Sequence, residues 1–331
     1  MLGLILRRLL QLPIILLVIY TLTLTLAWAV PGNPLERGDD RRPPREVEEA
    51  MKAQYNLDSF PKFYWSYLDS AIGLRWVREH WSGRATLTGA EAAIPARHPV
   101  FDLGPSLQYE DWRVNEIIAS SLPVSVTLGF AAILFALVVG VAAGVIGAVR
   151  PNSPADLATL AIALIGISLP SFVIGSALVL VFPIWLGIGH IGGWGTPGRI
   201  VLPAITLGLP LAAYIARLTR MGMLEALQAD YIRTARAKGL PESRVVLKHA
   251  LKNAFLPVLS FLGPACAAAM TGSFVVERVF FVPGIGQHFV NAVLNKDLFL
   301  IIGVVLIYST MLILFNLAVD VLYRWVDPRI A

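Results

Sequence analysis

Residues 117–149 read IIASSLPVSVTLGFAAILFALVVGVAAGVIGAV, and no charged side chain occurs among them. An α-helix rises about 1.5 Å per residue, so about 20 apolar residues cross the hydrocarbon core of a bilayer. The stretch exceeds that length, and it therefore predicts a membrane-spanning helix.

Five more uncharged runs occur along the chain. Run 200–216 is short and contains Pro203 and Pro210, so neighbouring helices or water must satisfy the carbonyls that these prolines leave free. The runs predict an all-α membrane protein with six transmembrane helices: a first helix in residues 1–30, an extracytoplasmic segment in 31–115 and five spans in 116–331. The five further runs are residues 9–30, 157–185, 200–216, 254–276 and 298–319.

The first run raises the question of a signal peptide, since Ala27-Trp28-Ala29 resembles a cleavage site. The apolar core of a signal peptide is about 7–15 residues long, and residues 9–30 exceed that range. We therefore expect a retained first span.

The basic residues predict the orientation in the membrane. Short cytoplasmic loops are rich in Lys and Arg, whereas long loops such as residues 31–115 are exempt from this rule. We therefore expect a multi-pass protein of the cell membrane with both termini in the cytoplasm. The expected inner side holds Arg7, Arg8, Arg150, Arg217, Arg220, the basic residues within 233–252, Arg324 and Arg329, against Arg199, Arg278 and Lys296 in short outer loops.

The outer segment carries signals for two short helices. Pro44 precedes apolar residues at helical spacing, and Pro61 follows a possible cap at Asp58 or Ser59. Its aromatic residues are typical of a cap at the depth of the lipid headgroups. Residues 83–99 show no clear period and are expected to form a loop. The apolar face of the second helix is predicted to contain Phe63, Tyr64, Tyr67 and Leu68.

Catalytic signatures are absent from the sequence, and the composition agrees with a membrane protein. Charged residues make up 15% of the chain, against about 25% in soluble proteins. The sequence contains no phosphate loop of the form GxxxxGK[ST], no HExxH, no CxxC and no GxSxG.

Cys266 is the one cysteine and is expected to be a small core residue. Residues 187–192 match GxGxxG, but they follow a span and lack the strand and acidic residue of a dinucleotide site, so we interpret them as an outer loop that includes His190.

Charged side chains within the runs are equally scarce. Ionisable groups at membrane depth usually mark a relay for protons or ions. We place the nearest candidates at the ends of spans, which argues against a proton-coupled transporter. These candidates are Asp156, Glu277, Arg278 and Asp320.

The longest inner segment, residues 217–252, predicts two short helices. The first is rich in helix formers and ends at Gly239, which suits a left-handed C-cap, and Pro241 suits the first turn of the second. Such a helix pair forms a rigid knob that fits a groove on a soluble partner. A basic amphipathic segment on anionic lipid explains the same residues equally well.

The knob also resembles a known family. Its sequence from Asp230 to Pro241, DYIRTARAKGLP, followed by His249-Ala250-Leu251-Lys252-Asn253-Ala254, is similar to the coupling loop of the dipeptide/oligopeptide permeases. These are membrane subunits of binding-protein-dependent ABC importers. The resemblance extends over nearly the whole chain: Pro31-Gly32-Asn33-Pro34, Asp102-Leu103-Gly104 with Ser106, residues 122–128, residues 168–172, Pro283-Gly284-Ile285-Gly286, and residues 316–329.

The resemblance implies a transport subunit that is not an enzyme and binds no cofactor or metal itself. ATP and Mg would be used by two ATP-binding subunits. A homologous second permease would complete a heterodimeric pathway for peptides, and an extracytoplasmic binding protein would deliver them. The implied contacts with the ATP-binding subunits are Asp230, Arg233, Thr234, Ala235, Arg236, Ala237, Lys238, Gly239, Leu240 and Pro241, of which Ala235, Gly239 and Leu240 would pack in the partner groove, with Arg236 and Lys238 at its rim.

Two departures and several alternatives remain. The general importer loop has Glu-Ala-Ala where this chain has Arg233-Thr234-Ala235, which favours peptides over sugars, and residues 72–100 resemble an insertion. Related importers carry nickel complexes or glutathione, so these substrates are alternatives to peptides.

Two other classes of protein are alternative interpretations of the chain. A stand-alone secondary transporter would need an ion site, and a membrane-embedded lipid enzyme would need clustered polar residues. Membrane lipid is an expected partner, and nucleic acid is not.

Overall fold

A computed structural model describes the chain except residues 1, 36–43, 82–98, 110, 271–273 and 327–331. The described residues are predominantly helical, and their one β-type pairing is an isolated bridge between Pro105 and Arg113. The helices are α1 (Leu2–Ala29), α2 (Arg45–Gln54), α3 (Phe60–Ala71), α4 (Leu74–Trp81), α5 (Val114–Val149), α6 (Pro154–Ser168), α7 (Ser171–Val179), η2 (Leu180–Trp185), α8 (Pro197–Gln228), α9 (Asp230–Ala237), α10 (Glu242–Arg244), η3 (Val245–Ala250), α11 (Leu251–Ala254), α12 (Leu256–Met270), α13 (Phe274–Val279), α14 (Ile285–Leu294) and α15 (Leu298–Val326).

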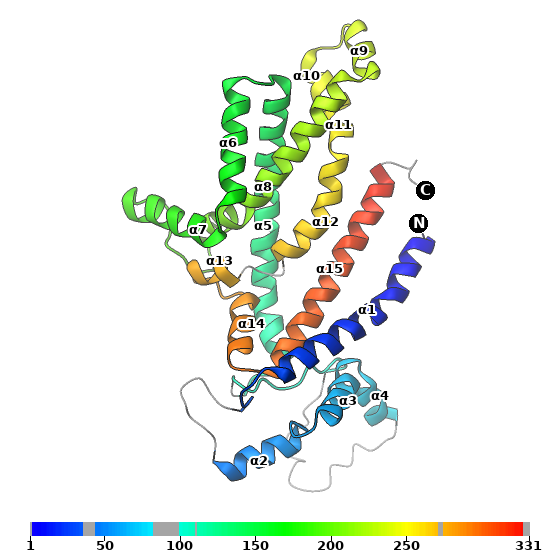
Figure 1. Cartoon of the computed structure of the whole chain (residues 1–331), viewed down its shortest axis with the longest axis vertical. Helices are drawn as coiled ribbons and strands as arrows, with labels where there is room; N and C mark the ends of the chain where they lie inside the picture. Colours follow the sequence, from blue (N-terminus) through cyan, green and yellow to red (C-terminus); the bar gives the residue numbers. More distant parts are fainter. Residues whose placement is uncertain (1, 36–43, 82–98, 110, 271–273, 327–331) are drawn as a thin grey trace. The chain divides into compact units, whose positions relative to one another are not determined.

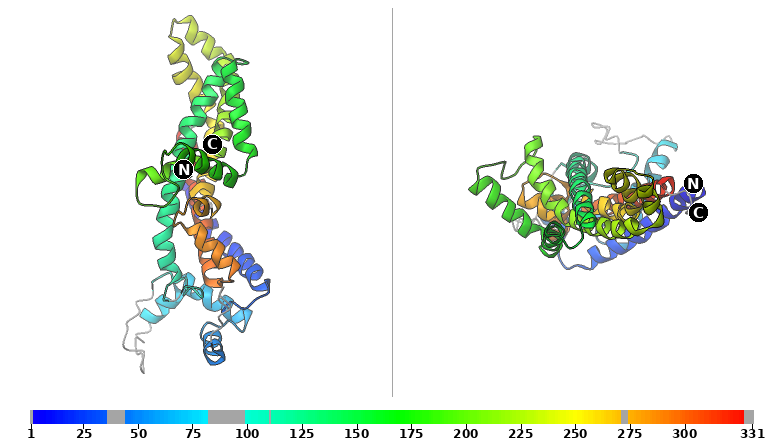
Figure 2. Two further views of the ribbon diagram at one scale, coloured as in Figure 1. Left: turned by 90° about the vertical axis from the view of Figure 1, so that its left-hand side faces the viewer. Right: turned by 90° about the horizontal axis from the view of Figure 1, so that it is seen from above.

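The helices fall into two compact units, which are described separately. Unit 1 comprises residues 1–13, 121–287 and 308–331, and unit 2 comprises residues 14–120 and 288–307. In unit 1, α9 and α10 project beyond the neighbouring ends of α5 and α6 in both side views (Figures 1 and 2).

Within the described ranges, four helices are long and apolar enough to cross a membrane: Leu6–Ala29, Val114–Val149, Pro197–Gln228 and Leu298–Leu322. Two bent pairs raise the number to as many as six if each pair is one span. The all-α class with apolar spans is therefore confirmed, whereas the number six depends on how the bent pairs are counted.

The predicted span at residues 157–185 is not one continuous helix. It consists of α6 followed by a second part, Ser171–Trp185, bent by 110° (Figure 1). The break lies at Leu169, whose ψ of 133° is extended, directly before Pro170. Proline disfavours helical geometry in the residue that precedes it, which explains the position of the break.

Helix α8 continues past the end of the predicted span at residue 216. The short run 200–216 is part of a helix of 32 residues that contains both Pro203 and Pro210 and continues to Gln228. Residues 217–228 therefore belong to the same helix as the span. The first of the two helices predicted in 217–252 is accordingly divided, at Ala229, between α8 and α9.

The outer segment follows the sequence signals and adds one helix. Pro44 precedes α2, and Ser59 is the N-cap residue of α3, where Phe63 and Tyr67 are buried as predicted. Helix α4 lies inside the expected insertion and was not predicted. Most of the expected loop at 83–99 lies outside the described residues.

Candidate functional site

Helix α9 is set off from α8 by a single extended residue. Ala229 has a ψ of 150°, which ends α8 and redirects the chain into α9. At the other end, the N–H of Gly239 donates to the carbonyl of Arg236, and the N–H of Leu240 donates to that of Ala235. This pair of bonds is a Schellman motif, and the φ of +75° at Gly239 is the left-handed conformation that the motif requires. The predicted helix end at Gly239 is confirmed.

The second predicted helix begins one residue later than expected. Pro241 is the N-cap residue, with φ −65° and ψ 143°, and α10 starts at Glu242. The chain then continues through η3 and α11 toward α12. We call residues 230–254 the knob.

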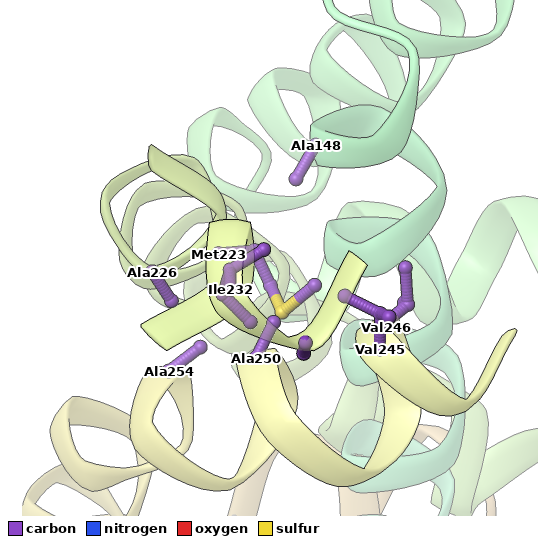
Figure 3. Close-up of a cluster of buried hydrophobic side chains, with 9 residues drawn as sticks. Ala148, Met223, Ala226, Ile232, Val245, Val246, Ala250 and Ala254 are labelled. Atoms are coloured by element: carbon purple, nitrogen blue, oxygen red, sulfur yellow. The ribbon is translucent and has the colours of Figure 1, made fainter. Parts of the chain in front are cut away.

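A small apolar core fixes the knob to the ends of the long helices in unit 1 (Figure 3). Ile232 of α9 is fully buried, as are Met223 of α8 and Val245 of η3. Burying an isoleucine side chain contributes roughly 1.5–3 kcal/mol, so these contacts hold α9 firmly. The cluster consists of Ala148, Met223, Ala226, Ile232, Ala235, Val245, Val246, Ala250 and Ala254.

The opposite face of the knob is exposed and basic. Arg236 donates to Glu242 through Nε at 3.1 Å and Nη2 at 2.5 Å, and this bond raises the pKa of the Arg236 guanidinium. A Cβ added at Gly239 would meet open space. Of the predicted contact residues, those exposed at this surface are Asp230, Arg233, Thr234, Arg236, Ala237, Lys238, Gly239 and Pro241.

Two predicted packing residues point the other way. Ala235 is 7% exposed and belongs to the chain's own core, and Leu240 packs against that core. Both therefore pack within the chain in this conformation, and their predicted contact with a partner stays a prediction. Both residues face inward because they form the C-terminal contact of the Schellman motif, which buries an apolar pair.

A buried ion pair ties α6 to the same part of α8. Arg220 donates to both carboxylate oxygens of Asp156 at 2.7 Å, and the N–H of Asn152 donates to one of them at 2.9 Å. The Asp156 side chain is 1% exposed and that of Arg220 is 20% exposed. A bidentate arginine–carboxylate contact fixes orientation as well as distance. The pair therefore holds the α5–α6 turn in one position on α8.

Close approach of α5 to α8 depends on glycine. A Cβ at Gly140 would lie 2.6 Å from the carbonyl oxygen of Ala212, and one at Gly144 would lie 2.5 Å from Cβ of Thr219. Residues 140 and 144 form the small-xxx-small spacing that lets membrane helices pack backbone to backbone. Helices α5, α6 and α8 thus form a closely packed group that continues into the knob.

A second buried carboxylate in unit 1 explains the Pro283-Gly284-Ile285-Gly286 motif. Ser125 donates its hydroxyl to Glu277 at 2.7 Å and accepts from the N–H of Ile285 at 3.0 Å. A Cβ at Gly284 would collide with the Glu277 carboxyl group, and one at Gly286 would lie 2.8 Å from Oε2. The glycines therefore make room for Glu277 at the start of α14, which is a structural role for this buried acid.

The GxGxxG match in unit 1 has no dinucleotide-binding geometry. It follows the π-helix η2, and His190 is exposed. A Cβ at Gly192 would collide with the carbonyl of Phe280, so this glycine permits close packing of two loops. In the described part of the chain, no group of three or more His, Cys, Asp or Glu side chains is placed to hold a metal ion.

Unit 2 contains a buried carboxylate of its own. Asp297 accepts from the hydroxyl of Ser106 at 2.5 Å, from the N–H groups of Leu107 and Gln108, and from the N–H of Leu300 at 3.1 Å. It is fully buried, and this burial raises the pKa of its carboxyl group although the hydrogen bonds act in the opposite direction. Asp297 thus joins the loop after Gly104 to the start of α15.

The sequence does not predict the Asp156–Arg220 pair. Its pattern places Asp156 at the end of a span and Arg220 among the basic residues of the inner side. Ser153 and Asp156 follow the spacing of a helix N-terminus, and the Ser153 hydroxyl does accept from the N–H of Asp156. That signal locates Asp156 in the first turn of a helix, but it does not reveal a partner 64 residues away.

Comparison with known proteins identifies the class. A model of the binding-protein-dependent transport system inner membrane component matches residues 136–331. The oligopeptide transport system permease protein OppB of Haemophilus influenzae is 40% identical over 333 residues, covering 100% of this chain and 99% of that protein. OppB of Escherichia coli K12 is 41% identical over 334 residues with the same coverage. The dipeptide transport system permease protein DppB of Bacillus subtilis is 38% identical over 315 residues, covering 95% and 93%.

The apolar helices and these matches define a multi-pass membrane component of a transport system. The chain belongs to the family of binding-protein-dependent transport system inner membrane components.

Proposed function

We propose that the chain is one permease subunit of an ABC importer for peptides and forms half of the translocation pathway. The observation that carries this proposal is the full-length similarity to oligopeptide and dipeptide permeases of three organisms. The proposal places the subunit in the cell membrane with both termini in the cytoplasm. A homologous second permease and an extracytoplasmic binding protein complete the importer.

The knob is the proposed contact with an ATP-binding subunit, one of two in the importer, because the chain itself contains no phosphate loop. Its exposed face offers cationic side chains around Gly239, and its inner face is fixed by the Ile232 core. A push on α9 therefore moves α8 with it. The Asp156–Arg220 pair and the glycine contacts of α5 pass that movement to α5 and α6. ATP binding then closes the pair of ATP-binding subunits, the knobs move, and the spans change from the inward-open to the outward-open state.

Gly239 and Gly195 allow a matched test of the coupling surface. Both have positive φ, +75° and +101°, and a Cβ at either position meets nothing within 4 Å. Gly239→Trp and Gly195→Trp therefore impose similar backbone strain at different surfaces of unit 1. Each variant is co-expressed with the second permease, ATP-binding and binding-protein subunits of the importer, and peptide uptake and ATP hydrolysis are measured in proteoliposomes.

We expect Gly239→Trp to lose peptide uptake and the ATPase stimulation caused by binding protein, while Gly195→Trp retains both. Equal activity of the two variants would remove the coupling assignment. Purification of the wild-type chain alone after gentle extraction, with no associated ATPase, would contradict the importer proposal as a whole.

A further inference from the structure

Helices α3 and α4 in unit 2 present a broad apolar surface that the described residues leave uncovered. Trp65 is 67% exposed, Ile72 50%, Leu74 52% and Val77 45%. Between the two helices lies a groove of about 420 Å³, and the ion pair between Arg78 and Asp69, at 2.6 Å, stands at this groove. Single exposed apolar residues are common, but a contiguous set rimmed by charge indicates contact with something apolar.

The apolar surface lies beside a membrane-spanning helix. The hydroxyl of Tyr20 in α1 donates to the carbonyl of Tyr64 in α3 at 2.6 Å, and the hydroxyls of Thr21 and Tyr64 are 2.9 Å apart. Near the end of α1, the ring of Trp28 meets that of Phe60 edge-on at 5.6 Å. Helix α3 therefore follows the last part of α1, from Trp28 back to Tyr20.

This arrangement sets the depth of α3. Tyr20 lies nine residues before Ala29, the end of α1, so it is about 13 Å inside that end along the helix axis. Phe63 and Tyr67 of α3 also contact the ring of Phe299, the second residue of α15, at 5.2 and 5.8 Å, so α3 lies at the level where α1 ends and α15 begins, near the boundary of the hydrocarbon core. At that boundary the apolar side chains of a helix can meet acyl chains while its charged side chains reach water.

We propose that α3 and α4 form an interfacial anchor at the boundary of the leaflet where α1 ends, with Trp65, Ile72 and Leu74 in contact with lipid acyl chains. Tryptophan suits this position because its ring is amphipathic and prefers the boundary of the hydrocarbon. The Arg78–Asp69 pair sits at headgroup level, where Arg extends its charged end toward water. The anchor is independent of what the protein transports.

The test measures the surroundings of each position with spin labels. Cysteine replaces Trp65, Ile72 or Leu74 in turn, in a Cys266→Ser background, since Cys266 is the one native cysteine. The full chain is reconstituted in vesicles of phosphatidylethanolamine and phosphatidylglycerol. Collision rates with oxygen, which concentrates in lipid, and with a nickel chelate, which remains in water, are measured for each label.

Two control positions calibrate the measurement. Leu22 of α1 is 59% exposed and provides the lipid reference, whereas Glu49 of α2 is an exposed charged position and provides the aqueous reference. We expect Trp65→Cys, Ile72→Cys and Leu74→Cys to resemble Leu22→Cys, with oxygen collisions exceeding those of the nickel chelate. Labels that resemble Glu49→Cys would overturn the proposal in favour of an aqueous surface. Labels shielded from both reagents would overturn it in favour of a covering protein.

A second measurement needs no cysteine. Vesicles containing lipids with brominated acyl chains quench tryptophans that touch those chains. We expect the quenched fraction of the fluorescence to decrease in Trp65→Phe relative to the wild type. An unchanged quenched fraction would place Trp65 outside the hydrocarbon.

Discussion

The knob of unit 1 and the cap of unit 2, formed by α2, α3 and α4, are both short helical elements attached to long helices, but they are built in opposite ways. The knob buries aliphatic side chains such as Ile232 and exposes charged ones such as Arg233. The cap buries Phe63 and Tyr67 against aromatic partners and exposes Trp65. A charged outer face suits a soluble protein partner, whereas an apolar outer face suits lipid.

The two units also contain different kinds of buried carboxylate. Asp156 in unit 1 is neutralised by a bidentate arginine, and Asp297 in unit 2 accepts hydrogen bonds from a hydroxyl and from backbone N–H groups. When one side chain of a buried ion pair is removed, the charge of the other side chain remains buried without a partner. Removal of a carboxylate that is held only by hydrogen bonds, such as Asp297, leaves neutral donors without an acceptor. We therefore expect unit 1 to be the more sensitive to loss of its acid.

Asp156→Ala should have the largest effect. It leaves the partly buried guanidinium of Arg220 without its partner and removes the acceptor of the Asn152 N–H. We expect the midpoint of thermal unfolding in detergent to fall by about 10 °C. The control is Asp230→Ala, which removes an exposed ion pair with Arg233 whose side chains are 94% and 75% exposed. A decrease no larger than that of the control would show that the buried pair does not hold α6 on α8.

Ile232→Ala should have the next largest effect. Ile232 is fully buried under α9, and truncation leaves a cavity that typically costs about 3 kcal/mol. Because the cavity lies at the base of the knob, we expect trypsin to cleave within residues 230–254 sooner than in the wild type. Leu247→Ala is the control, since this leucine of η3 is 62% exposed and its truncation should change stability by less than about 0.5 kcal/mol. Equal trypsin sensitivity of both variants would mean that the core does not fix α9.

Local signals in the sequence predicted much of the fold. A proline at a helix start, a glycine at a helix end and a long uncharged run are all signals carried by neighbouring residues. Gly239 and the helix over residues 117–149 were therefore predicted correctly, and α2 begins one residue after Pro44. The bend after α6 also had a local signal at Leu169-Pro170, but the apolar composition on both sides suggested one span. Hydropathy reports the environment of a helix and not its direction.

The candidate site was predictable only in part. The position of the knob follows from its sequence, but the inward orientation of Ala235 depends on Met223 and Val245 around it. The Asp156–Arg220 pair joins residues 64 apart, and spacing along the chain does not encode such a contact. Gly284 belongs to a sequence motif, but only the structure explains why a glycine is needed there, because a Cβ at this position would collide with the Glu277 carboxyl group.

Asp297→Asn should have a moderate effect that is confined to unit 2. The asparagine amide keeps one acceptor oxygen and replaces the other by an NH₂ group. In one orientation this NH₂ group faces the donors of Ser106 and Leu107, and in the other it faces the N–H of Leu300. We expect a loss of about 2 kcal/mol, measured by denaturant titration in detergent. Asp111→Asn in the same loop is the control, because Asp111 is exposed and asparagine tolerates its φ of +61°. If both variants unfolded at the same denaturant concentration, Asp297 would not be the tie between this loop and α15.

Arg236→Ala should have the smallest effect on folding and is the sharpest test of the knob's exposed face. The pair of Arg236 and Glu242 is solvent-exposed, with side chains 45% and 55% exposed, so its removal should leave the unfolding midpoint unchanged. Partner-stimulated ATP hydrolysis distinguishes two roles when Arg236→Ala, Glu242→Ala and the double variant are compared. If the pair acts only within the chain, all three variants should behave alike. If Arg236 contacts an ATP-binding subunit, Arg236→Ala should weaken stimulation, most strongly at low salt, whereas Glu242→Ala should leave the guanidinium available and stimulation intact. Because Ala235 and Leu240 face inward, the second result is the one we expect.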